Sequence, residues 1–333
     1  MKLLVTGGAG FIGSAFIRYW LREHPGDQVV NLDKLTYAGH VENLKEVKGN
    51  PNYTFIQGDI CNPRSVEKAM DGVDVVVHFA AESHVDRSVL NPLVFVETNV
   101  LGTATLLNQA RVQKVKRFHH VSTDEVFGHL EVDDPPFSEK TPFAPRTPYA
   151  ASKASSDLLV KAYFETYQLP ITITNCANNF GPFHDPEKLI PRFITNLLSG
   201  QKVPLMGKGE NIRSWLFVED HAKAIELVLE KGTVGETYVV GGEEKTNFEV
   251  TKRILELLGM GEDMIEFVEH RLGHDFRYAI DDSKLRRLGW EEPHSFDERL
   301  QETVEWFKEN SWWWKPLKEG RPNVDPVTQR TII

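Results

Sequence analysis

Short apolar runs alternate with longer amphipathic stretches along the first half of the chain. The apolar runs predict six strands, at residues 3–6, 28–33, 54–59, 74–80, 117–123 and 171–177. The stretches between them predict helices, most clearly at residues 12–23, 63–70, 91–113 and 149–168. This alternation is typical of a parallel sheet that is covered by helices on both faces. We therefore predict a doubly wound α/β fold.

The pattern changes from about residue 178 onward, where it becomes irregular and richer in proline and charge. We predict a first lobe over 1–177 and a smaller α/β lobe mainly over 178–333. Residues 213–240 again form a strand–helix–strand pattern, so we expect the chain to return to the first lobe there. Two lobes fit the length of 333 residues, because a single hydrophobic core rarely grows beyond ~250–300 residues.

Composition narrows the classes of function. The formal net charge is −10, and an acidic surface repels nucleic acid and anionic lipid. Two cysteines argue against a disulfide framework. No apolar run approaches the ~20 residues of a membrane span, and no signal-peptide pattern follows the first strand. We expect a cytoplasmic protein, and the lack of HExxH or CxxC spacing predicts that it has no catalytic metal.

A glycine-rich loop links the first predicted strand to the first helix. In LLVTGGAGFIG the glycines are Gly7, Gly10 and Gly13. Such glycines permit a tight turn and close approach to a pyrophosphate, which the N–H groups of the helix N-terminus attract. Asp33 ends the next strand, where an acid binds the ribose hydroxyls of NAD and disfavours NADP. Lys34 follows it and could weaken that preference. The alternative is a glycine-rich turn without a ligand.

Tyr149 and Lys153 form a YxxxK pair on the predicted helix 149–168. A spacing of four places both side chains on one helix face. An ammonium beside a phenol favours the phenolate, so we expect Lys153 to lower the pKa of Tyr149. Such a tyrosine can take a proton from a sugar hydroxyl while a nicotinamide takes the hydride, and Thr123 can supply a hydrogen bond. The alternative is an incidental surface pair.

Two adjacent acids, Asp124 and Glu125, follow the strand predicted at 117–123. Ligands of open α/β sheets bind at the carboxyl ends of strands. The pair is therefore a candidate for proton transfer, and its alternative is a solvated polar loop.

These features together resemble the extended short-chain dehydrogenase/reductase family, which implies a Rossmann-like fold. Six further segments resemble nucleotide-sugar 4,6-dehydratases, particularly those that act on dTDP-glucose: LDKLTYAG, AAESHVDRS, STDEVFG, NNFGPFHDPEKLIP, IRSWLFVEDHAKA and GHDFRYAID. The similarity extends from residue 1 to about residue 282. It departs at Phe127 and Phe180, where tyrosine is frequent, and at Ser214, where an acid is frequent.

The resemblance implies separate roles for the two acids. After Tyr149 and NAD have oxidised C4 of the sugar, Glu125 would remove the C5 proton and Asp124 would protonate the departing 6-hydroxyl. Asp124 must then hold a proton, and burial and the Glu125 charge should both raise its pKa. A 4-epimerase has no need for this pair, and a decarboxylase usually lacks the aspartate.

The candidate binding residues extend over both lobes. For NAD we predict contacts with Gly7, Gly10, Phe11, Ile12, Gly13, Asp33, Lys34, Leu35, Thr36, Asp59, Ile60, Ala80, Ala81, Thr98, Tyr149, Lys153 and Asn179. For the nucleotide sugar we predict contacts with Ser83, Thr123, Asn178, Glu187, Lys188, Leu189, Pro204, Arg213, Asn247, Arg271, His274 and Tyr278. By resemblance, Arg213 and Arg271 would bind the diphosphate, where the planar guanidinium fits phosphate.

Helices 91–113 and 149–168 carry apolar stripes beyond what one sheet face needs. Relatives pair such helices into a four-helix bundle, so we expect a homodimer, unless both stripes are ordinary core. Several other functions remain open on sequence alone: a UDP-glucose 4,6-dehydratase, a 4-epimerase, a decarboxylase, or an NAD-binding protein without catalysis. One fold hosts many functions, so the fold cannot choose among them.

Overall fold

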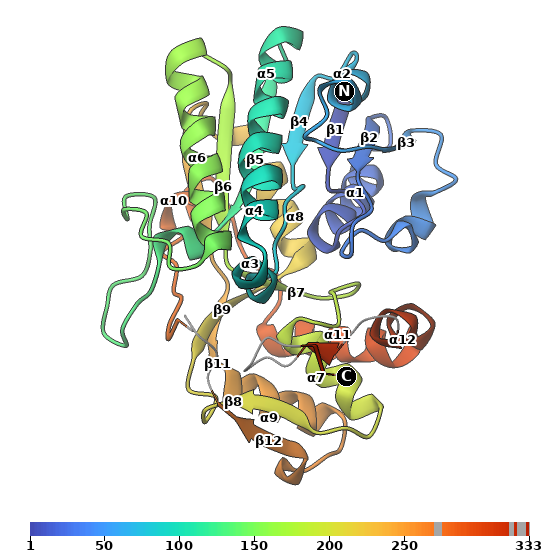
Figure 1. Ribbon diagram of the computed structural model, residues 1–333, viewed down its shortest axis with the longest axis vertical. Helices are drawn as coiled ribbons and strands as arrows, with labels where there is room; N and C mark the ends of the chain where they lie inside the picture. Colours follow the sequence, from blue (N-terminus) through green and yellow to red (C-terminus); the bar gives the residue numbers. More distant parts are fainter. Residues whose placement is uncertain (270–274, 320–322, 325–330, 333) are drawn as a thin grey trace.

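A seven-stranded parallel sheet forms the centre of the first lobe (Figure 1). The computed structural model describes residues 1–269, 275–319, 323–324 and 331–332. The strand order is β10-β6-β5-β4-β1-β2-β3. Their bounds are β1 (Lys2–Thr6), β2 (Gln28–Asp33), β3 (Tyr53–Gln57), β4 (Val75–His78), β5 (Arg117–Thr123), β6 (Ile171–Cys176) and β10 (Thr237–Val240). The six predicted strands and their parallel pairing are confirmed.

Helices cover both faces of this sheet, as the alternation predicts. α1 (Phe11–Glu23) and α8 (Val218–Lys231) pack on one face, while α2 (Pro63–Met70), α5 (Thr103–Gln113) and α6 (Pro148–Tyr167) pack on the other. Neighbouring strand residues alternate between the faces. Leu3 thus joins the core under α1, and Leu4 joins the core under α2 and α5. The fold is the doubly wound, Rossmann-like arrangement.

The predicted continuous helix 91–113 is wrong in detail. The structure has three segments before α5, namely α3 (Val85–Leu90), α4 (Pro92–Phe95) and the π-helical turn η2 (Val96–Gly102). The wider π turn buries Asn99, which bonds the backbone N–H and C=O of Glu82 and the hydroxyl of Ser152. π turns are frequent at functional sites. Here the turn joins the loop after β4 to helix α6.

The chain returns to the first lobe through β10, which pairs with β6. The strand that precedes α8 does not join the large sheet. β9 (Ile212–Phe217) pairs with β7 (Asn178–Phe180) and β11 (Glu243–Thr246) in a separate sheet. The predicted strand–helix–strand pattern is therefore present, but only its second strand enters the large sheet.

A separate hydrophobic core fills the second lobe, drawn in the lower half of Figure 1. It contains α7 (Leu189–Leu198), α9 (Asn247–Leu257), α11 (Phe296–Glu309), α12 (Ser311–Glu319), β8 (Val203–Met206) and β12 (Ile265–Val268). Capping boxes at Thr246 and Ser295 start α9 and α11, because each hydroxyl and a glutamate three residues later satisfy the free N–H groups.

Shorter elements connect these parts. They are η1 (Val41–Val47), η3 (Asp124–Phe127), η4 (Glu262–Met264), α10 (Ser283–Arg286), β13 (Asn323–Val324) and β14 (Thr331–Ile332). Within the described ranges, no helix combines the length and apolarity that crossing a bilayer requires.

Candidate active site

A cleft of about 450 Å³ opens at the carboxyl ends of the central strands and is lined by residues of both lobes. The strand order reverses beside β1, and such reversal points are the usual ligand sites of doubly wound sheets. The predicted residues that line the cleft are Gly7, Gly10, Phe11, Ile12, Gly13, Asp33, Lys34, Thr36, Asp59, Ile60, Ala80, Ala81, Ser83, Thr98, Thr123, Glu125, Tyr149, Lys153, Asn178, Asn179, Glu187, Lys188, Leu189, Pro204, Arg213 and Asn247.

Three predicted site residues do not line the cleft: Leu35, Asp124 and Tyr278. Leu35 has a left-handed backbone (φ 58°) and donates its N–H to Asp33. Tyr278 is buried, with its hydroxyl on Asp275 and its ring under the guanidinium of Arg213. Arg271 and His274 lie outside the described residues.

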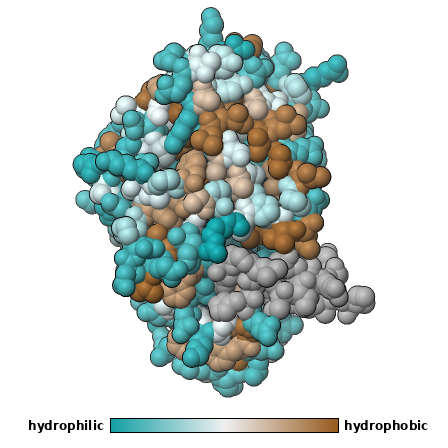
Figure 2. Space-filling model, turned by 60° about the vertical axis from the view of Figure 1, so that its left-hand side comes forward, coloured by the Kyte–Doolittle hydropathy of each residue, from teal (hydrophilic) through white to brown (hydrophobic). Residues whose placement is uncertain are grey.

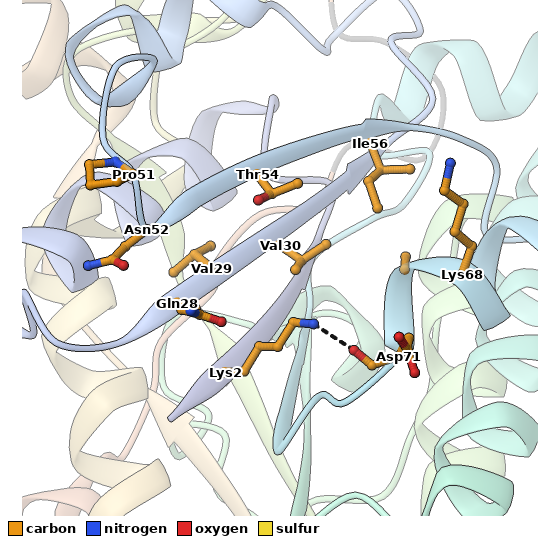
Figure 3. A pocket seen from close by; sticks show the side chains of 11 residues that line it. Lys2, Gln28, Val29, Val30, Pro51, Asn52, Thr54, Ile56, Lys68 and Asp71 are labelled. Atoms are coloured by element: carbon orange, nitrogen blue, oxygen red, sulfur yellow. Dashed lines mark hydrogen bonds between the residues drawn. The ribbon is translucent and has the colours of Figure 1, made fainter.

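A second hollow, of about 240 Å³, lies at the opposite ends of the strands (Figure 3). Lys2, Gln28 and Asn52 line it, and the Lys2 ammonium donates to the carbonyl of Asp71. Ligands of such sheets bind at the carboxyl ends, so we assign the chemistry to the larger cleft.

The geometry of the glycine loop fits a dinucleotide. Gly7 has a φ of +71°, and a Cβ there would lie 2.6 Å from Cα of Ala80. A Cβ on Gly13 would lie 2.4 Å from the carbonyl oxygen of Gly7. Gly10 is less crowded, with its nearest neighbour at 3.2 Å. Gly10 also starts α1 without a side-chain cap, which leaves the first-turn N–H groups for an anion. The site can therefore hold the pyrophosphate of NAD.

Asp33 anchors this loop from the end of β2. Its two carboxylate oxygens accept the N–H groups of Ala9 (2.9 Å) and Leu35 (2.8 Å). Burial raises the pKa of Asp33, and these two hydrogen bonds oppose the rise. Lys34 forms an ion pair with Asp59, with 2.7 Å between Nζ and Oδ2. The lysine that could weaken the preference for NAD is thus engaged with an acid that lies just after the next strand, β3.

The carbonyl of Ala9 is held by a contact that sequence reasoning missed. It accepts hydrogen bonds from Nδ2 of Asn43 (3.0 Å) and from the N–H of His40 (2.9 Å). Asn43 in turn accepts a 2.8 Å hydrogen bond from the indole of Trp313 in α12. Asn43 and Trp313 are both buried. Helix α12, the last one among the described residues, therefore supports the loop that follows β1.

The second lobe also reaches the start of α1. His184 stacks on Phe11 with a centroid distance of 4.3 Å and an interplanar angle of 13°. Burial lowers the pKa of His184 to about 3, so its ring is neutral. His184 belongs to the segment NNFGPFHDPEKLIP, but nothing in that segment indicates that its ring stacks on Phe11.

Tyr149 and Lys153 face the cleft from the first turns of α6, which Thr147 caps. The Lys153 ammonium donates to the carbonyl of Val121 over 2.8 Å. Contrary to the sequence prediction, the pKa of Tyr149 is raised well above its usual value. Burial is the largest cause, followed by the charge of Glu125, while a hydrogen bond with Thr123 opposes the rise. Burial also lowers the pKa of Lys153.

Asp124 and Glu125 occupy the single turn η3 directly after β5. Thr123 caps this turn by accepting the N–H of Glu125 (3.3 Å). Asp124 is only 1% exposed; its Oδ1 accepts the Thr123 hydroxyl (3.2 Å), while its buried Oδ2 has no hydrogen-bond partner among the described residues. Burial, and then the Glu125 charge, raise the pKa of Asp124 to about 8. The direction and both causes match the sequence prediction.

Comparison with known proteins agrees with this geometry. Residues 4–303 match the family model described as GDP-mannose 4,6 dehydratase. The chain is 50% identical to the dTDP-glucose 4,6-dehydratase of Neisseria meningitidis, over 96% of each chain. The chain belongs to the dTDP-glucose 4,6-dehydratase family. DesIV, the dTDP-glucose 4,6-dehydratase of Streptomyces venezuelae, was solved with NAD and dTDP bound. It matches with a TM-score of 0.92 and 50% identity over 95% of this chain and 100% of that one.

The same fold serves a different reaction in a more distant relative. The UDP-glucose 4-epimerase of Thermotoga maritima, solved with UDP-glucose, matches with a TM-score of 0.87. It is 31% identical and covers 93% of this chain and all of its own. The fold alone therefore does not separate a dehydratase from an epimerase, and the acids of the site have to do so.

Replacing Trp313 with phenylalanine tests the support of the glycine loop. The ring stays in the core, but the hydrogen bond to Asn43 is lost. Such a bond contributes about 0.5–1.5 kcal/mol, so we expect NAD to dissociate about 2- to 10-fold faster. The rate is measured as loss of bound NAD after dilution. The control is Trp312→Phe, which removes an exposed indole bond to Asn310. Equal retention of NAD in both variants would contradict the role of Trp313.

Proposed function

We propose that the protein is an NAD-dependent dTDP-glucose 4,6-dehydratase, which converts dTDP-glucose to dTDP-4-keto-6-deoxyglucose and water. The observation that carries this proposal is the burial of Asp124 directly beside Glu125, which lines the cleft. Burial and the Glu125 charge raise the pKa of Asp124 to about 8. An acid that holds its proton at neutral pH beside an ionised acid is what the loss of water between C5 and C6 requires. The family relationship supports the same reaction.

Tyr149 is the base for the first step. It removes the proton of the sugar 4-hydroxyl, and Thr123 supplies a hydrogen bond to the reacting oxygen. NAD held at the glycine loop of Gly7, Gly10 and Gly13 would supply the redox chemistry, as acceptor and later donor of hydride, and its oxidised form would add a positive charge to the cleft. The Lys153 ammonium favours the phenolate of Tyr149, against the burial and the Glu125 charge that raise its pKa.

Glu125 and Asp124 then act as the base and the acid of the elimination. The 4-keto group acidifies the C5 proton, which Glu125 removes. Asp124 gives its proton to the 6-hydroxyl, which leaves as water. Reprotonation of C5 and the return of hydride to C6 complete the product. Since the cofactor is regenerated in every cycle, the protein should keep NAD bound between turnovers.

The substrate side of the cleft offers a fixed cation for the diphosphate. The guanidinium of Arg213 donates to the carbonyls of Ile212, Asp275 and Phe276 over 2.7–3.1 Å. It also lies 4.4 Å from the centre of the Tyr278 ring. These contacts orient the side chain before substrate binds, and its planar fork suits phosphate oxygens. Asn178 and Ser83 would face the hexose, and Leu189 and Pro204 would lie near the base.

Assays with two nucleotide sugars test the proposal. The purified protein is incubated with dTDP-glucose or UDP-glucose, without added NAD, and the 4-keto-6-deoxy product is measured by its alkaline absorbance. We expect turnover of dTDP-glucose. The methyl group that separates thymine from uracil is worth only ~1–3 kcal/mol, so we expect slower turnover of UDP-glucose. Turnover of neither sugar would reject the proposal, and release of a 4-epimer would favour the epimerase alternative.

Asp124→Asn should separate elimination from oxidation. The amide cannot donate an acidic proton, so we expect elimination to slow by about 100- to 10,000-fold, while bound NADH accumulates and is followed by absorbance. In the wild type, Asp124 donates only while protonated. Elimination should therefore fall above about pH 8. The control is Asp133→Asn, at an exposed acid. A parallel loss of oxidation and elimination would contradict the proposed roles.

We propose further that the protein is a homodimer in which the helical run α4–η2–α5 and helix α6 form a four-helix bundle with their counterparts. Large apolar residues are exposed on these helices and on the preceding α3: Val89, Leu90, Leu93, Val96, Leu101, Val112 and Leu158. Figure 2 brings the left-hand side of Figure 1 forward and shows apolar surface gathered on the upper half of the molecule. A patch of this kind favours a protein partner. A second copy fits because such a symmetric contact buries the same helices on both chains.

Leu93→Glu tests the dimer, because Leu93 is 76% exposed in the single chain. A charge buried without a partner costs about 3–5 kcal/mol, which weakens association by about two to four powers of ten. Analytical ultracentrifugation should then detect monomers at micromolar concentration. The control is Phe267→Glu, at an exposed position of β12 in the other lobe. Equal sedimentation of the wild type and Leu93→Glu would rule out this interface.

We also place the enzyme in the cytoplasm. Cys61 and Cys176 are both free thiols, which fits a reducing compartment. No nucleic acid or membrane partner is proposed, in line with the net charge of −10.

A further inference from the structure

Helix α6 carries a third titratable residue in line with Tyr149 and Lys153. Asp157 lies four residues beyond Lys153, so the three side chains occupy one face of the helix. Asp157 is fully buried and does not line the cleft. A buried carboxyl group is rare unless it is paired, and the mechanism above does not use this one.

The contacts of Asp157 reach both halves of the catalytic site. Its Oδ2 accepts a 2.9 Å hydrogen bond from Nδ2 of Asn175, which also donates to the carbonyl of Thr123 (3.1 Å). Its Oδ1 lies 3.1 Å from Nε2 of His120, whose side chain is likewise fully buried. Asp157 is therefore joined through Asn175 to the turn of the two catalytic acids, and it lies one helical turn behind Lys153.

The surrounding groups leave Lys153 as the main cation near Asp157. His78 and His120 are buried, and burial holds the pKa of each well below its usual value, so both rings are neutral. Burial raises the pKa of the Cys176 thiol to about 12, and burial also keeps Tyr149 neutral.

Burial raises the pKa of Asp157 to about 6, against the charge of Lys153, the hydrogen bonds of Asn175 and Ser122, and the charge of Lys161 one turn further along α6. Asp157 is therefore largely ionised at neutral pH. The Glu125 charge raises the pKa of Asp124 and of Tyr149. Burial lowers the pKa of Lys153, and the Asp157 carboxylate is the largest influence that opposes this fall. An ammonium removed from water needs such a counter-charge to stay protonated.

We propose that Asp157 is a positioning residue for the Tyr149–Lys153 pair: its carboxylate, which accepts the hydrogen bond from Asn175, keeps the buried Lys153 charged. Lys153 can favour the phenolate of Tyr149 only while it is an ammonium. Asp157 thus acts on the first proton transfer through another side chain and touches neither substrate nor cofactor. This inference rests on the proposed function, because it assigns Lys153 its role in oxidation at C4.

Asp157→Asn keeps the shape of the side chain and removes its charge. We expect the pKa of Lys153 to fall and that of Tyr149 to rise further. The rate of C4 oxidation, measured as bound NADH after rapid mixing with dTDP-glucose, should fall about 10- to 100-fold at neutral pH, since each unit of pKa is a factor of ten. The plot of the C4 oxidation rate against pH should be bell-shaped. In the variant it should narrow on both sides, because the pKa of Tyr149 rises and that of Lys153 falls. KM should be nearly unchanged. Asp157→Glu should restore most of the rate and the profile.

Ser156→Ala is the matched control. Ser156 is buried in the same turn of α6 and donates to the carbonyl of Lys153 over 2.8 Å. Its loss should lower the melting temperature without moving the pH profile. If Asp157→Asn does not fold, Asn175→Ala tests the same idea, because without this donor the pKa of Asp157 rises further and a larger fraction of the group is protonated at neutral pH. This variant should narrow the profile less.

The outcomes separate this inference from the proposed function. A wild type that turns over no nucleotide sugar refutes the function. An active wild type and a folded Asp157→Asn with the same pH profile would refute the role of Asp157 alone. A narrowed profile that Asp157→Glu restores would support it.

Discussion

Removal of the Asp124 carboxyl group from water is the constraint on which the proposed chemistry depends. In water an aspartic acid is ionised at neutral pH and has no proton to give. In η3 the group is enclosed beside Glu125, where a second negative charge would be unfavourable. The same enclosure raises the pKa of Tyr149 and lowers that of Lys153. Burial thus keeps Asp124 protonated, as the elimination requires, but it disfavours the Tyr149 phenolate that the oxidation requires.

The two lobes contribute different properties to this region. The parallel sheet places Thr123, the acids and α6 at its carboxyl edge, where the strand order reverses. The second lobe contributes Arg213 and the segment around Glu187 and Lys188, which close the other side of the cleft. His184 stacked on Phe11 joins the lobes next to the pyrophosphate position. Enclosure of the site therefore follows from the meeting of two separately packed cores.

The sequence predicts much of the fold because local periodicity decides it. Strands β2 and β5 and helix α2 have the predicted bounds. The π turn at Asn99 was missed, since one extra residue in a turn hardly alters an apolar pattern. The pairing of β9 with β7 and β11 depends on tertiary position, which a strand pattern does not contain.

The same division holds for the site. Glycine spacing, Asp33, YxxxK and the acid pair are local signals, and most of these residues line the cleft. The hydrogen bond between Asn43 and Trp313 joins residues 270 positions apart. The pKa of Tyr149 was predicted in the wrong direction, because burial outweighs a neighbouring ammonium and burial is a property of the complete fold.

The hydrogen bonds from Trp313 to Asn43 and from Asn43 to Ala9 also bear on the order of events during synthesis. A ribosome makes the glycine loop well before α12, because Trp313 follows Asn43 by 270 residues. An emerging chain can form its early strands, but the loop lacks this support until Trp313 has been translated. Firm capture of NAD therefore follows the folding of α12. A product truncated before Trp313 would contain all seven strands of the central sheet and still release its cofactor faster.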